Sequence, residues 1–234
     1  MKKSRCLGLI GGVGVGATIH YYEKLAAGCE SQGRTLDMVM AHAETPRVLQ
    51  AARADDRSGL AEYLNGYIRR LQAAGAEFAA IPSVTTHFCV RELSAISPLP
   101  VLDVFNPLSA ELVARAVQRV ALFGTRFAIE SELFGQVDQV EFILPKPEEI
   151  DYIHKTYVEV ALTGTGSADQ HEGLSALAHT ILKRDKVDAI VLAGTDLVVL
   201  FNSGNTDFPS IDCADLHIRA ILNHILADTS SAQP

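Results

Sequence analysis

Short apolar segments alternate with longer amphipathic segments along most of the 234-residue chain. The apolar segments are rich in Val, Ile, Leu and Ala and do not alternate between apolar and polar positions, which is typical of parallel strands buried on both faces. They predict strands at residues 6–11, 37–43, 77–82, 100–104, 119–124, 139–144 and 187–193.

Most of the segments between these strands have the apolar spacing of helices. Leu60, Leu64, Ile68 and Leu71, for example, fall on one face of a helix. Helices are predicted at residues 17–28, 60–74, 108–117, 149–162 and 174–183. Alternating strands and helices predict an α/β fold in which parallel sheets are flanked by helices.

The same order of features occurs twice along the chain. Residues 70–87 and 182–196 each run from the end of a helix through an apolar strand to a loop of small and polar residues. This weak similarity suggests an internal repeat and two similar domains. We expect the first domain to comprise residues 1–106 plus 212–234, and the second to comprise residues 107–211.

The composition is that of a soluble globular protein, with 48% hydrophobic and 21% charged residues. It excludes a disordered chain, a collagen-like chain and a small disulfide scaffold. With a net charge of −8 the chain lacks the broad basic face that nucleic-acid backbones require, so we expect no nucleic-acid partner. The first apolar run stops at a glycine and later ones contain aspartates, so we expect neither a signal peptide nor a membrane span.

The cysteines predict neither a zinc site nor a disulfide framework. Cys6, Cys29, Cys89 and Cys213 are scattered along the chain and form no C-x-x-C pair. Thiols that stay reduced are typical of cytoplasmic proteins, so we expect the chain in the cytoplasm.

A glycine-rich loop follows the first predicted strand and opens a helix. Gly12, Gly14 and Ala17 fit the pattern G-x-G-x-x-A, in which glycines let backbone N–H groups approach a phosphate. A dinucleotide site also needs an acidic residue about 20 residues further on, and Glu44 comes too late. We therefore expect this loop, with Val13, to bind a carboxylate. A dinucleotide site and a plain turn remain alternatives.

Polar side chains also follow the strand at 77–82. Ser83, Thr85 and His87 stand there, and hydroxyl and N–H groups at the carboxyl end of a parallel strand suit an anionic ligand. Ser83 or Thr85 could also cap the helix that follows. Ser83 and His87 have the residue types of a nucleophile and its base, but the chain has no G-x-S-x-G elbow of a serine hydrolase.

Two further strand ends carry candidate ligand-binding residues. Thr195 and Asp196 follow the last predicted strand and could bind an amino or hydroxyl group, or cap a turn. Thr125 and Arg126 follow the fifth predicted strand. Arg126 could hold a carboxylate through two parallel hydrogen bonds, or it could be a solvated surface residue.

The second predicted strand ends in His42, Glu44 and Arg47. Arg47 is a candidate for a second carboxylate clamp. The H-x-E spacing of His42 and Glu44 occurs in zinc deaminases, but the P-C-x-x-C segment that completes their zinc site is missing. We expect no metal site.

Taken together and in order, the strand-end loops resemble those of aspartate/glutamate racemases. The matching segments are residues 8–14, 81–87, 120–126 and 192–197, and they span nearly the whole chain. The resemblance implies two similar α/β domains with the active site in a cleft between them, no cofactor, and an amino acid or small carboxylate as substrate. It also implies a homodimer.

The resemblance breaks at the two positions that carry the family's chemistry. The family uses two cysteines as acid and base, and the matching positions here are Ser83 and Gly194. Val84 stands where the family has an asparagine that contacts a carboxylate. We expect the small residues Ser83 and Gly194 to enlarge the site for a substrate bulkier than aspartate. Cys89 and Cys213 are not expected to replace the missing thiols.

The two-thiol reaction cannot run without its thiols, because a serine hydroxyl is not a base unaided and a glycine has no side chain. We therefore expect altered chemistry, such as that of a lyase, decarboxylase or isomerase, through a carbanion or enolate. Ser83, Asp196, His87 and Glu44 are the candidates for moving protons. A one-base racemase or epimerase and a non-catalytic carboxylate-binding homologue remain open. The candidates for substrate binding are Gly12, Val13, Gly14, Arg47, Val84, Thr85, Thr125, Arg126, Gly194 and Thr195.

Overall fold

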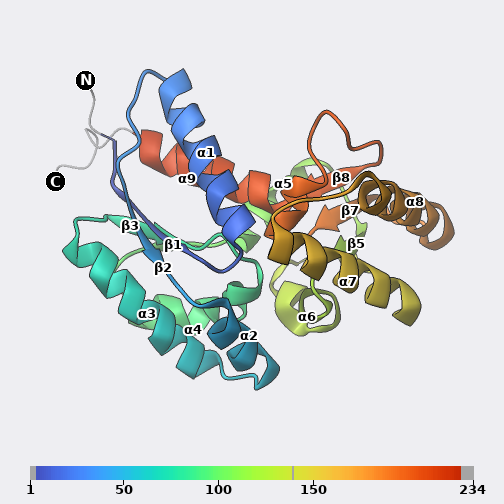
Figure 1. Ribbon diagram of the computed structural model, residues 1–234, viewed down its shortest axis with the longest axis horizontal. Helices are drawn as coiled ribbons and strands as arrows, with labels where there is room; N and C mark the ends of the chain where they lie inside the picture. The colour runs from blue at the N-terminus through green and yellow to red at the C-terminus, as the bar shows by residue number, and fades with distance from the viewer. Residues whose placement is uncertain (1–3, 139, 228–234) are drawn as a thin grey trace.

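The computed structural model describes residues 4–138 and 140–227 and contains two parallel sheets (Figure 1). Gln139, which begins the strand predicted at 139–144, and the end of the predicted first domain, residues 228–234, lie outside the described residues. The first sheet has the order β2-β1-β3-β4 and the second has the order β6-β5-β7-β8. The predicted α/β fold is confirmed.

The strands of the first sheet are β1 (Leu7–Gly11), β2 (Met38–His42), β3 (Phe78–Ala80) and β4 (Val101–Leu102). Those of the second are β5 (Arg119–Phe123), β6 (Glu141–Phe142), β7 (Ala189–Leu192) and β8 (Ser210–Asp212). Every described pairing is parallel. In each sheet the first strand pairs with the second on one side and the third on the other, so the suggested repeat exists at the level of topology.

The helices of the first half include α1 (Val15–Ser31), α2 (Thr45–Arg53), α3 (Arg57–Ala73), α4 (Val90–Ile96) and α5 (Phe105–Ala114). Those of the second half include α6 (Arg126–Glu130), α7 (Pro147–Thr163), α8 (Ala168–Asp185) and α9 (Cys213–Leu226). Three short 3₁₀ helices are described as well, η1 (Thr85–Cys89), η2 (Glu132–Gln136) and η3 (Thr195–Val199).

The predicted helices all occur, with ends displaced by a few residues. In α3 the predicted apolar face, Leu60, Leu64, Ile68 and Leu71, is buried. The sequence analysis missed β8, α2, α6 and α9. β8 is three residues long and becomes a strand only through its pairing with β7, which no local pattern reveals. α9, in contrast, has apolar residues at helical spacing that could have been recognised.

Helix α9 returns to the first sheet, where it lies beside α1 (Figure 1). Ile218, Ile221 and Ile225 pack in one apolar cluster with Leu7 and Leu9 of β1. This packing agrees with a first domain that includes the C-terminal residues. The domain boundaries themselves stay a prediction.

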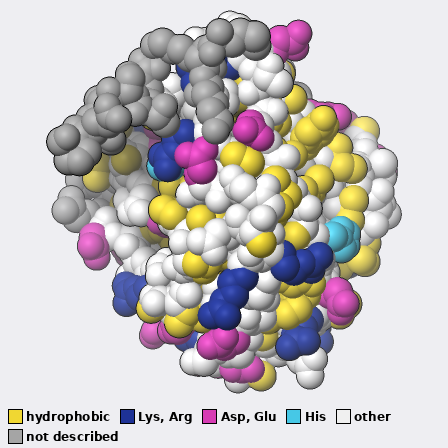
Figure 2. Space-filling view, turned by 90° about the vertical axis from the view of Figure 1, so that its left-hand side faces the viewer, with side chains coloured by type: hydrophobic (Ala, Val, Ile, Leu, Met, Phe, Trp, Pro, Cys, Tyr) yellow, Lys and Arg dark blue, Asp and Glu magenta, His cyan; other side chains and the backbone are white. Residues whose placement is uncertain are grey.

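The surface seen in Figure 2 carries acidic and basic side chains interspersed among apolar and uncharged ones. On that face, the described residues form no broad basic area of the kind that binds nucleic-acid backbones. Within residues 4–138 and 140–227, no helix is both long and apolar enough to cross a bilayer.

Candidate active site

The loops that follow β3 and β7 meet between the two sheets. The Thr195 hydroxyl donates a hydrogen bond of 3.2 Å to the carbonyl oxygen of Pro82, the residue before Ser83. The loop after β5 packs on the same place, because a Cβ atom at Gly124 would lie 3.1 Å from the backbone carbonyl carbon of Ala193. The strand ends that carry Ser83, Thr125 and Thr195 are therefore brought together, as the sequence predicts.

Gly194 leaves no empty space, because the ring of Tyr157 fills it. A Cβ atom at Gly194 would lie 2.7 Å from Cδ2 and 3.0 Å from Cζ of Tyr157, and closer still to Cε2. Real Cβ atoms do not approach other atoms so closely. The expectation that Gly194 enlarges the site is therefore wrong, since an aromatic ring from α7 stands where a side chain at position 194 would begin.

Tyr157 is also tied to Asp196. Its phenol donates a hydrogen bond of 3.0 Å to Oδ2 of Asp196. Burial, together with the nearby Asp196 carboxylate, raises the pKa of Tyr157 well above its ordinary value. The phenol is therefore protonated at neutral pH and acts as a hydrogen-bond donor.

The second carboxylate oxygen of Asp196 caps α1 from the other half of the molecule. The backbone N–H of Ala17, in the first turn of α1, donates a hydrogen bond of 3.0 Å to Oδ1 of Asp196. Only 2% of Asp196 is exposed. Burial raises the pKa of this carboxyl group, while the hydrogen bonds from Ala17 and Tyr157 act in the opposite direction.

The glycine loop fits closely around this carboxylate. Gly14 has a φ of +87°, and a Cβ atom there would lie 2.8 Å from Oδ2 of Asp196. The N–H of Gly12 donates to the Thr18 hydroxyl at 3.1 Å, and Val13 is buried in the core. The predicted carboxylate-binding loop thus holds a carboxylate of its own chain. Binding of a substrate carboxylate by Gly12, Val13 or Gly14 stays a prediction.

His87 is buried, with its ring bonded to the backbone of Ser83 and packed in the core. Its Nδ1 lies 2.7 Å from the carbonyl oxygen of Ser83, and its buried Nε2 has no hydrogen-bond partner among the described residues. Its ring packs edge-on against Phe105 and His217. Burial lowers the pKa of His87 and keeps the ring neutral. The geometry supports a structural role for His87 and gives no support to proton transfer.

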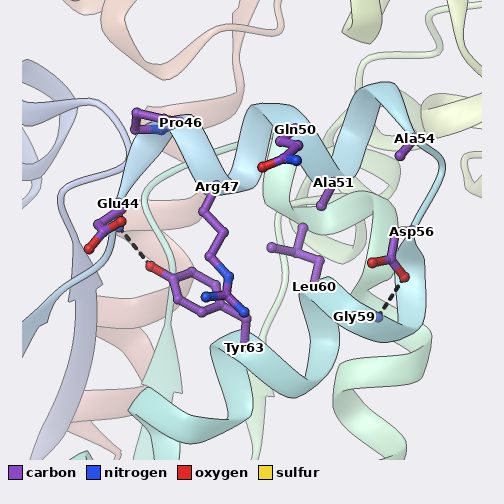
Figure 3. Close-up of a pocket in the computed structure, with 10 residues that line it drawn as sticks. All are labelled: Glu44, Pro46, Arg47, Gln50, Ala51, Ala54, Asp56, Gly59, Leu60 and Tyr63. Atoms are coloured by element: carbon purple, nitrogen blue, oxygen red, sulfur yellow. Dashed lines mark hydrogen bonds between the residues drawn. The ribbon is translucent and has the colours of Figure 1, made fainter.

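Glu44 and Arg47 lie in a separate groove between α2 and α3 (Figure 3). The groove has a volume of about 490 Å³, and Ser83, Gly194 and Asp196 are not among the residues that line it. The Arg47 guanidinium stacks 4.4 Å from the ring centre of Tyr63. The backbone N–H of Glu44 donates to the Tyr63 hydroxyl at 2.9 Å. The side chains of this pair therefore line the groove, while the chain next to Glu44 contacts the glycine loop, because the Thr45 hydroxyl donates a hydrogen bond of 2.8 Å to the carbonyl oxygen of Gly12. A role for Glu44 or Arg47 toward a substrate stays a prediction.

Arg126 and Thr125 already have partners within the chain. The Arg126 guanidinium pairs with Glu130 at 2.6 Å and with Asp151. The Thr125 hydroxyl accepts a hydrogen bond of 3.0 Å from Ala128 N–H and caps α6. Of the two alternatives for Arg126, the structure favours a surface residue in an ion-pair network.

The remaining candidates near Ser83 are buried. Val84 and Thr85 are 3% and 8% exposed, and the Val84 side chain belongs to the core cluster. Cys89 and Cys213 are both fully buried. Burial raises the pKa of Cys89 to about 12 and that of Cys213 further. Neither thiol supplies a thiolate at neutral pH. No group of histidine, cysteine or acidic side chains in the described part of the chain could hold a metal ion.

The sequence analysis missed Tyr157. It lies inside a helical pattern and far from any strand end, so no motif draws attention to it. The only signal in the sequence was the glycine at position 194, where the family has a cysteine. Protein interiors are close-packed, so the space left by that smaller residue has to be filled by a neighbouring side chain.

Comparison with known proteins supports the same assignment as the loops. Residues 10–221 match the family described as Asp/Glu/Hydantoin racemase. The broad specificity amino-acid racemase RacX of Bacillus subtilis (strain 168) is 22% identical over 231 residues, which cover 94% of this chain and 98% of that protein.

Two solved structures share the fold. The aspartate racemase of Picrophilus torridus superposes with a TM-score of 0.77 at 21% identity, covering 94% of this chain and 93% of the other. An aspartate racemase homologue from Pyrococcus horikoshii OT3 gives a TM-score of 0.78 at 20% identity, covering 95% and 98%. With the matched loops and a family match over nearly the whole length, the chain belongs to the Asp/Glu/Hydantoin racemase family.

Proposed function

We propose that this chain is an enzyme that acts on an amino acid or small carboxylate where the Ser83 and Gly194 loops meet, through a carbanion or enolate and without two thiols. The observation that carries this proposal is the hydrogen bond from Thr195 to the carbonyl of Pro82, which joins the two loops across the two halves. The printed name of the Bacillus subtilis relative, an amino-acid racemase, supports the substrate class.

The polar groups at this junction fit a reaction with a single proton-transfer group better than racemisation by two groups. Racemisation by two groups needs a base on one face of the carbon and an acid on the other. The first half offers the hydroxyl of Ser83, which is not a base unaided. The second half contributes the Tyr157 phenol, which donates a hydrogen bond of 3.0 Å to the Asp196 carboxylate. Elimination, decarboxylation and one-base isomerisation fit this set of groups.

Substrate entry requires the two loops to separate. Ser83, Thr195 and Asp196 are 5%, 2% and 2% exposed, and hydrogen bonds from Thr195 and Ala17 connect the two halves. A substrate must therefore break these contacts or bind while they are open. Loops of this kind open on a microsecond to millisecond timescale in many enzymes.

A second candidate function is the binding of a carboxylate without turnover. It is favoured by the position of Asp196, because a carboxylate already occupies the N-terminus of α1. In this alternative, an external carboxylate would displace Asp196 and hold the two halves in a different arrangement.

The following experiment separates the two functions. The protein is incubated in D₂O with both enantiomers of each amino acid and with short dicarboxylates, and NMR follows α-deuteration, inversion and loss of groups. We expect turnover of at least one compound. Ser83→Ala should lower the rate about tenfold or more, the effect of losing one hydrogen bond to a charged group. Ser94→Ala, an exposed serine on α4, is the control. Calorimetric binding without any turnover would favour the second candidate.

Three further properties are proposed. From the family resemblance, the chain is a homodimer and needs no cofactor, and from its free thiols it works in the cytoplasm. Light scattering on the purified chain tests the first of these, and full activity after exhaustive dialysis tests the absence of a cofactor.

A further inference from the structure

At the junction of the loops, the Tyr157 side chain occupies the space next to Gly194, which has no side chain of its own. The Tyr157 ring fills the space in which a side chain at position 194 would begin. Its phenol therefore reaches the junction from the second half, the side on which Gly194 itself can offer nothing to a substrate.

The chain around Thr195 connects this phenol to the Ser83 loop. Tyr157 contacts Gly194 and hydrogen-bonds Asp196, and Thr195 between them donates to the carbonyl of Pro82 at 3.2 Å. The residue between the two contacts of Tyr157 is therefore the one bonded to the backbone next to Ser83. A substrate that opened the Thr195–Pro82 contact would bind between Ser83 and Tyr157.

We propose that Tyr157 is the catalytic acid of this site, with Asp196 as its positioning residue. The inference rests on the proposed function and names the group that gives the proton. Asp196 holds the phenol at 3.0 Å through Oδ2, and its Oδ1 is fixed by the N–H of Ala17. The phenol is therefore anchored by a carboxylate that is itself fixed to α1.

The proton balance of the step is simple. The substrate loses a group that leaves its bonding electron pair on carbon, as CO₂ does, and a carbanion or enolate results. The O–H bond of Tyr157 then breaks, its proton forms a C–H bond with that electron pair, and a phenolate remains. Water returns a proton to the phenolate when the loops open. Because a resting phenol is protonated at neutral pH, Tyr157 can act as an acid but not as a base.

Tyr157→Phe tests this role, because phenylalanine keeps the ring beside Gly194 and removes only the hydroxyl. Tyr152→Phe is the control, since Tyr152 lies on the same helix and is 40% exposed. On the compound that wild type turns over, we expect Tyr157→Phe to lower kcat about 10²- to 10⁴-fold while Kd changes less than threefold. Tyr152→Phe should match wild type. Activity of Tyr157→Phe within threefold of wild type would overturn the inference and leave the proposed function intact.

A second measurement does not depend on how Tyr157→Phe folds. A fluorinated tyrosine at position 157 has nearly the same size but a more acidic phenol. We expect it to move the alkaline limb of the kcat profile to lower pH, whereas the same substitution at position 152 should not. An unmoved alkaline limb would overturn the role of Tyr157. A wild type without turnover of any compound would overturn the proposed function and this inference together.

Discussion

The phenol of Tyr157 lies 3.0 Å from Oδ2 of Asp196, although 39 positions separate the two residues in the sequence. The other oxygen of the same carboxylate accepts the N–H of Ala17, 179 positions away. One buried aspartate therefore connects α7, the loop after β7 and the N-terminus of α1. The stability of the assembled protein and its chemistry both depend on this connection.

Asp196→Asn should destabilise the protein. The amide keeps the size of the side chain, but it replaces one of the two oxygens that accept hydrogen bonds from Tyr157 and Ala17 with an NH₂ donor and removes the negative charge. We expect the free energy of unfolding to fall by about 1–3 kcal/mol, measured by urea denaturation. Asp169→Asn in the exposed first turn of α8 is the control and should change it by less than about 0.5 kcal/mol. Equal effects of the two substitutions would contradict the role of Asp196.

Asp212 should make stability depend on pH. Burial, with the charge of Asp215, raises the pKa of Asp212 from 3.8 to about 7 in the folded protein. The folded state then binds this proton more tightly than the unfolded state, so its contribution to stability is present below pH 4 and is lost as pH rises to about 7.

Asp212→Asn isolates this effect, because asparagine can still cap α9 as Asp212 does through Ala214 N–H. The free energy of unfolding is measured by urea denaturation across that pH range. Relative to the variant, wild type should lose stability as pH rises. Parallel curves for the two proteins would show that Asp212 titrates normally.

Gly194→Ala should destabilise the protein through a collision with Tyr157. The added Cβ atom would lie 2.7 Å from Cδ2 of the Tyr157 ring, and overpacking of this kind costs about 1–3 kcal/mol. The double variant with Tyr157→Ala should recover part of that loss, as a double-mutant cycle would measure. Gly66→Ala is the control, because a Cβ there meets nothing within 4 Å. An additive cycle would contradict the contact.

The same collision affects any attempt to introduce the family's two cysteines at positions 83 and 194. Ser83→Cys with Gly194→Cys places cysteines at both family positions, but the second one cannot enter while Tyr157 fills the space. We expect α-proton exchange of aspartate or glutamate in D₂O only when Tyr157→Ala is added. Exchange by the double variant alone would mean that the Tyr157 ring moves aside.

The native cysteines should be dispensable for turnover. Cys89 and Cys213 are fully buried, and burial raises the pKa of Cys89 to about 12. We expect Cys89→Ala and Cys213→Ala to keep activity within a few-fold of wild type, and iodoacetamide to leave the native enzyme active. Rapid inactivation by labelling of one of these thiols would show that it takes part in the reaction.

NADH should not bind to the glycine loop. The Asp196 carboxylate already accepts the N–H of Ala17, so a pyrophosphate would have to displace a buried and hydrogen-bonded side chain. We expect no saturable change of NADH fluorescence on titration with the protein. A saturable signal that disappears in Gly14→Ala would restore the dinucleotide alternative.

The sequence by itself determined all the strands except β8, most of the long helices and the strand ends that meet. Apolar segments and helical spacing are properties of neighbouring residues, so Leu60, Leu64, Ile68 and Leu71 could be assigned to a buried face before any packing was known. Parallel strands place their carboxyl ends at one edge of each sheet, and the resemblance implies that the two sheets share one cleft, so Ser83 and Thr195 could be expected to converge. The absence of the family's two cysteines could also be recognised from the sequence, because matching the loops residue by residue places Ser83 and Gly194 at those positions.

Only the tertiary structure decided which groups occupy the junction. That the glycine loop holds Asp196, that Tyr157 fills the space at Gly194 and that Arg126 pairs with Glu130 are contacts between side chains from different elements. The hydrophobic pattern directs an element to the core but does not specify its neighbours, since burial is non-directional. Hydrogen bonds and close packing depend on distances of a few tenths of an ångström, and those distances exist only after the two sheets have come together.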